Sequence, residues 1–537
     1  MNALSFTQLW LALLLSCLWA DTSVAVRELQ LLESVACPQP SPTTPTSNFT
    51  QFLTSPTFVA EATKRLIGAV KIPTMVYDGM GPTNEDPRWA PFKDLHSYLH
   101  ITFPQIHSQL DLSIVNEYAL IYTWRGTNRD LKPLMLTGHL DVVPVDTDLN
   151  QWTHPPFAGA SDETWIYGRG SSDCKNNVIG IMTSIEQLLS VGWKPKRTII
   201  LAFGNDEEIG GVHGATSIAA HLLSEHGNNS IAMIVDEGGS GLDSQYGVDI
   251  ALPGVAEKGL VNVIINVDML GGHSSVPPDH TTIGILAKIV ARIEDANVFQ
   301  PQMRLESPIW GQLSCISKYG QPAKVPAWIK SAVQSENPDM NAVAQQFAKQ
   351  SLDSRYLIQT SKAVTLFHAG IKSNVLAESA NATINSRIEF FNSTTETEKV
   401  FYDEVLVVAQ RHNLRFQGKQ VTKSSPTGNI TMYISLADEP SPVAPFDGAS
   451  AAWNAFSKAV QAAFGPQVVT SPSGMTGNTD TRRYWNLTHT IYRWSPTRLG
   501  TALNKHAANE MIKIESHIEG IRFYTELIIQ LDQRIDL

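Results

Sequence analysis

Several features that define other protein classes are scarce or missing in this 537-residue sequence. Basic residues are outnumbered, with 40 Lys and Arg against 51 Asp and Glu, and they form no Lys/Arg-rich run. Nucleic-acid partners are excluded, because binding to the phosphate backbone requires a basic surface. Three motifs are also absent: the phosphate loop G-x-x-x-x-G-K-[ST], the dinucleotide fingerprint and the G-x-S-x-G serine elbow. The sequence therefore gives no support for phosphate-loop nucleotide binding, dinucleotide binding or hydrolysis by a serine nucleophile.

Cysteine is rare as well, with four in the whole chain. Cys17 falls in an N-terminal leader, so that Cys37, Cys174 and Cys315 remain in the mature protein. An odd and sparse set of this kind predicts no disulfide framework. Without C-x-x-C spacing it also predicts no zinc-thiolate site. We expect Cys174 to be a small buried hydrophobe.

Long apolar runs are missing apart from one at residues 9–20. This run is shorter than the roughly 20 residues that span a bilayer, and it predicts a signal peptide within residues 1–25. A retained signal anchor is the alternative, because no Lys or Arg precedes the run. Six N-x-S/T sequons also favour the secretory pathway; they lie at Asn48, Asn228, Asn381, Asn392, Asn429 and Asn486. The expected destination is a vacuole, a lysosome or the cell exterior, with membrane attachment if the anchor is retained.

The remaining chain has the composition of a folded protein, with 43% hydrophobic and 17% charged residues. After a Pro/Ser/Thr-rich lead-in at residues 26–50, unbroken apolar runs alternate with helical patterns. This alternation is typical of a largely parallel sheet with helices on both faces. The fold class we predict is α/β, with a mixed, largely parallel sheet in a catalytic domain covered by helices. The predicted strands lie at 134–137, 198–203 and 231–235, and the first helix at 178–189.

A smaller α+β domain is predicted as an insertion at residues 257–425, and we refer to it as the lid. Its first strand, 259–269, alternates apolar and polar residues, as expected for a half-exposed antiparallel sheet. Further elements are predicted in the lid at 281–294, 363–368, 382–391 and 396–412. The catalytic domain would then comprise residues 51–256 and 426–537, ending in a helix at 516–533.

Polar residues follow the predicted parallel strands where each strand ends, and ligands bind at that edge of such sheets. His139 and Asp141 follow the first strand, Glu207 and Glu208 the second, and Asp236 and Glu237 the third; Asp173 precedes the helix at 178–189. So many carboxylates in one place repel one another unless cations neutralise them. Imidazole and carboxylate ligands suit Zn²⁺, with Co²⁺ or Mn²⁺ as substitutes.

At these residues the sequence resembles the M20 family of co-catalytic metallopeptidases. His139, Asp173, Glu208 and Asp236 occur in the family order, 34, 35 and 28 residues apart. The stretches at 168–176 and 477–482 are most similar to the carboxypeptidase S branch, the Gly-Xaa carboxypeptidases. Secreted N-fatty-acyl-amino acid amidohydrolases share much of the pattern.

The resemblance implies two zinc ions per subunit and a role for each ligand. Asp173 would bridge the two ions, with His139 and Asp236 completing one site and Glu208 and His506 the other. Glu237 remains an alternative to Asp236. Glu207 would be the general base, since a carboxylate that is not occupied as a ligand is free to take a proton.

Further roles concern positioning and substrate binding. Asp141, two residues beyond His139, would point its carboxylate at the imidazole and fix the tautomer. By resemblance, His273 in the lid would stabilise the oxyanion, coming from the partner subunit in dimeric members of the family. Asn374, Arg387 and Arg482 match positions associated with the substrate carboxylate.

These observations predict a zinc carboxypeptidase that releases C-terminal residues from small peptides. An N-acyl amino acid amidohydrolase, including one with fatty acyl chains, is the alternative and uses the same metal chemistry. An inactive metal-binding scaffold is a third hypothesis, although neither a ligand nor Glu207 is missing. Dimerisation through the lid is expected by analogy with the family.

Overall fold

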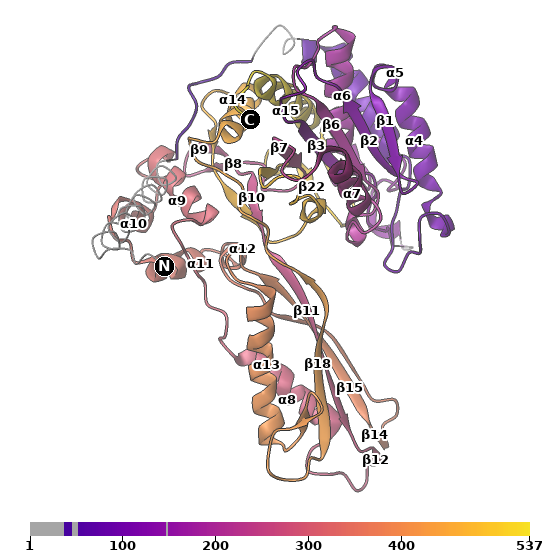
Figure 1. Ribbon diagram of the computed structural model, residues 1–537, viewed down its shortest axis with the longest axis vertical. Helices are drawn as coiled ribbons and strands as arrows, with labels where there is room; N and C mark the ends of the chain where they lie inside the picture. Colours follow the sequence, from indigo (N-terminus) through magenta and orange to yellow (C-terminus); the bar gives the residue numbers. More distant parts are fainter. Residues whose placement is uncertain (1–36, 46–51, 147–148) are drawn as a thin grey trace, which may run out of the picture.

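The structure is a computed structural model that describes residues 37–45, 52–146 and 149–537. A domain of sheets and helices carries a long projecting arm, the lid (Figure 1). The predicted leader at 1–25 and part of the lead-in lie outside the described residues. Within the described residues, no helix has the length and apolar character needed to cross a bilayer.

The catalytic domain is built on an eight-stranded sheet. Its strands, in spatial order, are β1 (Asp111–Val115), β2 (Ala119–Trp124), β6 (Ile199–Gly204), β3 (Leu134–His139), β7 (Met233–Asp236), β21 (Ile491–Arg493), β10 (Gly254–Glu257) and β20 (Ser473–Met475). Strands β6, β3, β7 and β21 are parallel, as are β10 and β20, and the other pairs are antiparallel. The predicted mixed, largely parallel sheet is confirmed.

Successive residues of a strand point to opposite sides of the sheet. Because the central strands are buried at every position, both faces of the sheet are covered by helices. Met135 and Ile200 pack with α7 (Ala215–His226) on one face, whereas Leu134 and Leu201 belong to the larger core on the other. The larger core is formed with α3 (Pro56–Val70), α4 (Pro91–Thr102), α5 (Pro104–Gln109), α6 (Lys175–Ser190), α14 (Ala451–Phe464) and α15 (Ile514–Asp532).

Two small sheets border the main one. One consists of β8 (Leu242–Gln245), β9 (Val248–Ala251) and β19 (Val469–Thr470), and the other of β4 (Ala160–Ser161), β5 (Trp165–Tyr167), β22 (Ala502–Leu503) and β23 (Met511–Lys513). The second sheet joins the segment before α6 to the segment before α15, because β5 pairs with β23. It therefore brings two loops that are far apart in the sequence to the same edge of the domain.

The lid is a six-stranded sheet with two helices, α8 (Thr282–Asp295) and α13 (Thr394–Arg411), on one face. Its strands are β13 (Ala363–Ala369), β15 (Ser379–Ile388), β11 (Gly259–Met269), β18 (Gly428–Asp438), β16 (Arg415–Phe416) and β17 (Lys419–Gln420). At the far end, β12 (Gly272–His273) pairs antiparallel with β14 (Val375–Leu376), which follows much later in the sequence. Val261, Val263 and Ile265 are buried against the helices, and the residues between them are partly exposed. The predicted alternating strand is confirmed.

The structure corrects the predicted end of the lid. Strand β18 pairs with β11 along its length, from Leu260 opposite Asp438 to Met269 opposite Gly428. The lid therefore continues to about residue 438, and 425 is too early. An apolar strand whose partner lies some 170 residues away gives no local sign of the sheet to which it belongs.

A second correction concerns helices inside the predicted lid: α9 (Pro308–Tyr319), α10 (Ala327–Gln334), α11 (Met340–Ala348) and α12 (Leu352–Leu357). They form a core with Ile250, Leu252 and Val469 of the catalytic domain, and so lie against that domain rather than in the arm. Cys315 of α9 forms a disulfide with Cys37, a bond that the sparse cysteine set did not predict. The bond suggests an oxidising compartment.

Candidate active site

The predicted strand-end residues meet at one edge of the main sheet. His139 ends β3, Glu207 and Glu208 form the short helix η3 (Glu207–Ile209) after β6, and Glu237 directly follows β7. Because β6, β3 and β7 are adjacent and parallel, their carboxyl ends lie together. The sheet therefore positions one imidazole and three carboxylates at a single edge.

Asp173 lies between two groups of ligand-type side chains. Its Oδ1 is 3.3 Å from His139 Nε2, and its Oδ2 is 3.1 Å from His506 Nε2. Oε1 of Glu208 is also 3.1 Å from His506 Nε2. The two oxygens of a single carboxylate thus face two different imidazoles, an arrangement that suits a carboxylate shared by two ions.

His506 is positioned by a loop of unusual backbone conformation. It has a φ of 58°, and Asn504 and Asn509 in the same loop have φ values of 58° and 61°. Non-glycine residues rarely adopt this left-handed conformation, which clusters at functional sites. The loop connects β22 to β23 and thereby carries His506 to Asp173 from a segment remote in sequence.

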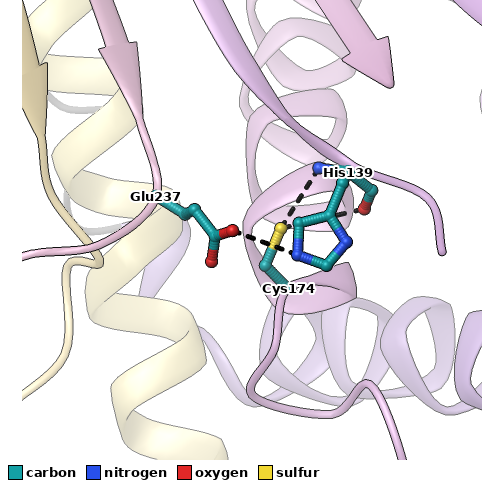
Figure 2. A group of neighbouring side chains, drawn as sticks. All are labelled: His139, Cys174 and Glu237. Carbon is teal, nitrogen blue, oxygen red and sulfur yellow. Dashed lines mark hydrogen bonds and ion pairs between the residues drawn. The ribbon is translucent and has the colours of Figure 1, made fainter. Parts of the chain in front are cut away.

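Figure 2 shows how Glu237 lies relative to His139. Oε1 of Glu237 is 3.1 Å from His139 Nε2, so that both side chains face the same point. Asp236 instead accepts a 2.8 Å hydrogen bond from the Glu237 backbone with Oδ1, and its carboxylate belongs to none of the ligand-type groups among the described residues. Burial and the neighbouring Glu237 raise the pKa of Asp236 to about 7. The geometry therefore favours Glu237 over Asp236 as a ligand.

Cys174 is buried beside the same imidazole, also seen in Figure 2. Its Sγ accepts a 3.2 Å hydrogen bond from the His139 backbone N–H and lies 3.7 Å from the His139 carbonyl oxygen, to which it can donate. Burial raises the pKa of the thiol well above its ordinary value. Cys174 therefore packs as a neutral side chain against the end of β3.

Asp141 connects the imidazole to the neighbouring strand. Its Oδ1 is 3.3 Å from His139 Nδ1, and its two oxygens accept hydrogen bonds from the backbone N–H groups of Glu207 and Glu208 at 3.2 and 3.0 Å. A carboxylate in this position favours the tautomer that leaves Nε2 free for a ligand. The same contacts hold η3 next to His139.

Glu510 fixes the loop that carries Asp173, and sequence reasoning did not assign it a role. Its buried carboxylate accepts hydrogen bonds from Arg169 Nη1 at 2.6 Å and from the backbone N–H groups of Gly170, Ser172 and Asp173. A buried ion pair with this many donors restrains the backbone strongly. The position of Asp173 thus depends on a residue near the C-terminal end of the chain.

The electrostatics of the cluster favour a cation. Hydrogen bonds to Asp173 and Glu208 raise the pKa of His506 to about 10. Burial and the neighbouring carboxylates raise the pKa of Glu207 well above its ordinary value, even though His139 opposes the shift. These are signs of uncompensated negative charge. Two imidazoles and several carboxylates within ligand distance of one another fit a pair of divalent ions such as Zn²⁺.

A cavity of about 460 Å³ lies over the cluster. Asp173, Glu207, Glu208, Glu237, Lys505 and His506 line it, together with the loop at 474–479 and with Asp353 and Leu357 of α12. Arg387 and Arg482 are outside this lining. Arg387 Nη1 donates to Asn478 Oδ1 at 2.6 Å, and Arg482 Nη1 pairs with Asp438 at 2.9 Å. Asn478, which sequence reasoning did not single out, lines the cavity, and its Nδ2 donates to the Lys258 carbonyl oxygen at 2.7 Å.

The structure does not bring His273 or Asn374 to this cavity within one chain. Both lie where β12 pairs with β14, at the far end of the lid in Figure 1. The Asn374 carbonyl accepts a hydrogen bond from the backbone of Ser274, and Ser275 bonds to Nδ1 of the exposed His273. These two predicted residues are thus close to each other and distant from the predicted ligands.

Comparison with known proteins identifies relatives across almost the whole chain. The model of peptidase family M20/M25/M40 matches residues 135–530. Carboxypeptidase S of Saccharomyces cerevisiae is 35% identical, with 90% of this chain and 86% of that protein covered. A human N-fatty-acyl-amino acid synthase/hydrolase is 32% identical, with 87% of each chain covered.

A solved M20 family metallo-carboxypeptidase from Sulfolobus solfataricus has the same fold, with a TM-score of 0.60 and 19% identity. The match covers 88% of this chain and 99% of that one. Residues 135–530, which include all the predicted ligands, are matched by the family model. The chain therefore belongs to peptidase family M20, a family of hydrolases that includes dinuclear metal-binding peptidases.

Proposed function

We propose that the protein is a zinc-dependent carboxypeptidase that releases C-terminal amino acids from small peptides. The observation that carries the proposal is the placement of Asp173, whose two oxygens face His139 at 3.3 Å and His506 at 3.1 Å. This is the arrangement of a carboxylate shared by two metal ions. The likeness to carboxypeptidase S supports a substrate with a free C-terminus.

His139 with Asp173 and Glu237, whose carboxylates both face its Nε2, would hold one ion, and Asp173, Glu208 and His506 the other. Glu237 takes the place that the resemblance gave to Asp236, because only Glu237 faces His139. Two bound zinc ions supply Lewis-acid polarisation of the scissile carbonyl and a water of lowered pKa. Asp141 keeps the His139 imidazole in the tautomer that offers Nε2.

Glu207 would act as the general base. It lines the cavity within ligand distance of His139 and Glu208, and within the described residues its carboxylate accepts no hydrogen bond. It is therefore free to take the proton of the attacking water and to transfer it to the amine that leaves. Glu208 is committed to His506, so the two adjacent glutamates have different roles.

Substrate recognition would combine the two domains. On the catalytic side, Asn478 lines the cavity and is held between Arg387 and the Lys258 carbonyl oxygen, with Arg482 nearby. From the lid, His273 and Asn374 would reach the cavity of a second subunit in a homodimer. The tip carries exposed apolar residues that suit such a contact: Leu270 is 87% exposed, Val276 81% and Ile371 94%.

The protein is proposed to enter the secretory pathway. The Cys37–Cys315 disulfide favours an oxidising compartment. The sequon residues Asn228 and Asn486 are both exposed, as glycosylation demands. Carboxypeptidase S as a relative supports the same pathway, with a vacuole, a lysosome or the exterior as the destination.

The test is hydrolysis by the purified full chain, measured before chelation, after chelation and after restoration of zinc. An amino-blocked Gly-Leu dipeptide and an N-oleoyl amino acid serve as the two substrates. We expect hydrolysis of the dipeptide, its loss on chelation and its return with zinc. Zinc-loaded protein that is inert on both substrates would contradict the proposal.

The second candidate is an N-acyl amino acid amidohydrolase, favoured by the 32% identity to the human N-fatty-acyl-amino acid synthase/hydrolase. Its metal chemistry would be the same, because both reactions cleave an amide next to a free amino acid. A preference for N-oleoyl amino acid over the dipeptide would establish this candidate in place of the first.

A further inference from the structure

A second cavity, of about 390 Å³, adjoins the catalytic one. Ser240, Asp353 and Leu357 line both, so that the two spaces are continuous at these residues. The second cavity thus begins where the catalytic cavity ends, on the side of α12. Its size lies within the range of small-molecule binding sites.

Its walls come from two regions far apart in sequence. The β8–β9 hairpin of the catalytic domain supplies Asp243, Gln245 and Tyr246. The opposite wall is made by α9, α11, α12 and the turn between the last two, which contribute Gln312, Leu313, Ile316, Phe347, Gln350, Asp353, Ser354 and Leu357. The helices that we had assigned to the lid therefore form part of a binding space.

The helical wall is held in place by covalent and apolar contacts. Cys315 lies on α9 between lining residues and is bonded to Cys37. Ile316, Leu313 and Phe347 belong to the core that includes Leu252 of the catalytic domain. A wall fixed in this way provides a largely preformed cavity, and preformed sites lose less entropy on binding.

The lining of the second cavity is apolar on one side and acidic on another. Leu252, Leu313, Ile316 and Phe347 provide apolar surface, whereas Asp243 and Asp353 provide two carboxylates, and no Lys, Arg or His is among its lining residues. Gln245 Nε2 donates to Asp243 at 2.9 Å. Within the described part of the chain, the exposed carboxylate of Asp353 accepts no side-chain hydrogen bond and forms no ion pair.

Beyond the catalytic cavity, Arg387 donates to Asn478 of the cavity wall, whereas Arg482 is paired with Asp438. The catalytic cavity therefore has a guanidinium group behind Asn478, and the second cavity carries two carboxylates and no cation among its lining residues. A peptide carries complementary charges, with a carboxylate at its C-terminus, the scissile bond next to it and an ammonium group at its N-terminus.

We propose that the second cavity binds the amino-terminal part of a peptide substrate with a free amino group. The proposal rests on the proposed peptidase function and names its substrate class: unblocked peptides of three or more residues, with an apolar residue immediately before the residue whose carbonyl forms the scissile bond. A long fatty acyl chain fits this space poorly, because it would bury the two carboxylates against hydrocarbon.

The first test compares Leu-Gly-Leu with its N-acetylated form, using zinc-loaded full-length protein. We expect kcat/KM to be about tenfold higher for the free amine, the order of effect of one charge-assisted contact. The double variant Asp243→Asn/Asp353→Asn should reduce this ratio to about two or less. Because the readout is a ratio between two peptides, a general loss of activity in the variant does not affect it.

Asp130→Asn is the matched control. Asp130 is an exposed carboxylate before β3 and outside both cavities, so the variant removes one surface charge elsewhere and should keep the tenfold ratio. A ratio near one in the wild-type protein, or an unchanged ratio in the double variant, would overturn the proposal.

The second test measures binding without turnover. In zinc-loaded Glu207→Gln protein, calorimetry should give a dissociation constant for Leu-Gly-Leu about tenfold lower than that for its acetylated form. Gln350→Trp, which places a large side chain in the second cavity, should remove the difference. Tighter binding of an N-oleoyl amino acid than of the free tripeptide would overturn the proposal.

The two proposals fail in distinguishable ways. Absence of hydrolysis for every peptide would refute the carboxypeptidase function, and the calorimetric comparison would still decide what the second cavity binds. Hydrolysis of peptides with no preference for a free amino group would leave the carboxypeptidase function intact and refute only the role of the second cavity.

Discussion

The catalytic edge and the lid tip both carry residues with predicted roles, but they are built in opposite ways. His139 is 1% exposed and contacts Asp141 of its own segment and, from two other segments, Asp173 and Glu237. His273 is exposed, in a strand of two residues, and its ring bonds to the neighbouring Ser275. The catalytic edge therefore holds its geometry by itself, whereas the proposed role of His273 would need a partner surface.

This contrast predicts different consequences of substitution. At the catalytic edge, changes should alter metal content and catalysis together, because the ligands share partners and their effects are coupled. At the tip, changes should leave folding and metal binding intact. The following experiments test or refine that distinction.

The largest effect is expected at the two adjacent glutamates of η3. Glu207→Gln should lower kcat by about 10³-fold, since a general base contributes roughly 10²–10⁴-fold, with full zinc content. Glu208→Gln should lower activity and lose zinc as well, because Glu208 contacts His506. Elemental analysis of both variants shows which glutamate is needed for zinc binding. Loss of zinc from Glu207→Gln would show that Glu207 is a ligand.

Adjacent residues after β7 give the next comparison. Glu237→Gln should weaken the binding of one zinc ion and reduce kcat/KM by about 10²-fold, a typical loss on disturbing a metal site. Asp236→Asn should retain two ions, because only Glu237 faces His139. Zinc affinity measured by chelator competition distinguishes the two variants. Loss of zinc from Asp236→Asn but not from Glu237→Gln would identify Asp236 as the ligand.

At the lid tip, His273→Ala should reduce kcat by about 10²-fold, the order expected for one oxyanion donor. The melting temperature should not change, because the side chain is exposed. If His273 serves the partner's cavity, mixing His273→Ala with Glu207→Gln protein should restore part of the activity through mixed dimers. Failure to complement in a protein shown to dimerise would place His273 outside the reaction.

The disulfide links the lead-in to the helical wall, and its loss should affect stability more than chemistry. Cys37→Ser/Cys315→Ser should lower the free energy of unfolding by about 2–4 kcal/mol. The ratio between free and acetylated Leu-Gly-Leu should fall as well, because α9 is less constrained. Urea unfolding provides the measurement, with Cys174→Ala as a control for the remaining buried cysteine.

The smallest effect concerns pH and stability. Burial lowers the pKa of His517, on α15, to about 4 from 6.5. The unfolded chain therefore binds this proton between pH 6.5 and 4 and the folded chain does not, so stability falls as pH decreases below 6.5. From pH 7 to 5, this residue should account for a loss of about 2 kcal/mol, at 1.36 kcal/mol per pH unit. Urea unfolding of His517→Gln should show a correspondingly smaller pH dependence, and an unchanged dependence would contradict the assignment.

Much of the catalytic edge could be predicted from sequence because a parallel sheet aligns its strand ends. Each apolar strand ends at or just before one of these residues: His139, Glu207 with Glu208, or the pair at 236–237. Because the strands are parallel neighbours, their carboxyl ends lie at the same edge of the sheet. The choice between Asp236 and Glu237 was not predictable. It depends on where β7 stops, and a difference of one residue there reverses which side chain points at His139.

Contacts between residues that are far apart in the sequence could also not be predicted from local sequence patterns. Cys37 and Cys315 are 278 residues apart, and only the packing of α9 against the catalytic domain brings them together. The end of the lid was misplaced because β18 looks the same whichever sheet it joins. Asn478 lies within a motif that was recognised, but its contact with Arg387 becomes visible only when the two domains are placed together.

The central claim is that this sheet edge holds two metal ions that share Asp173. Anomalous diffraction at the zinc edge from zinc-loaded crystals tests it directly. We expect two peaks per chain, roughly 3.5–4 Å apart, one among His139, Asp173 and Glu237 and the other among Asp173, Glu208 and His506. A single peak, or two peaks without Asp173 between them, would contradict the account.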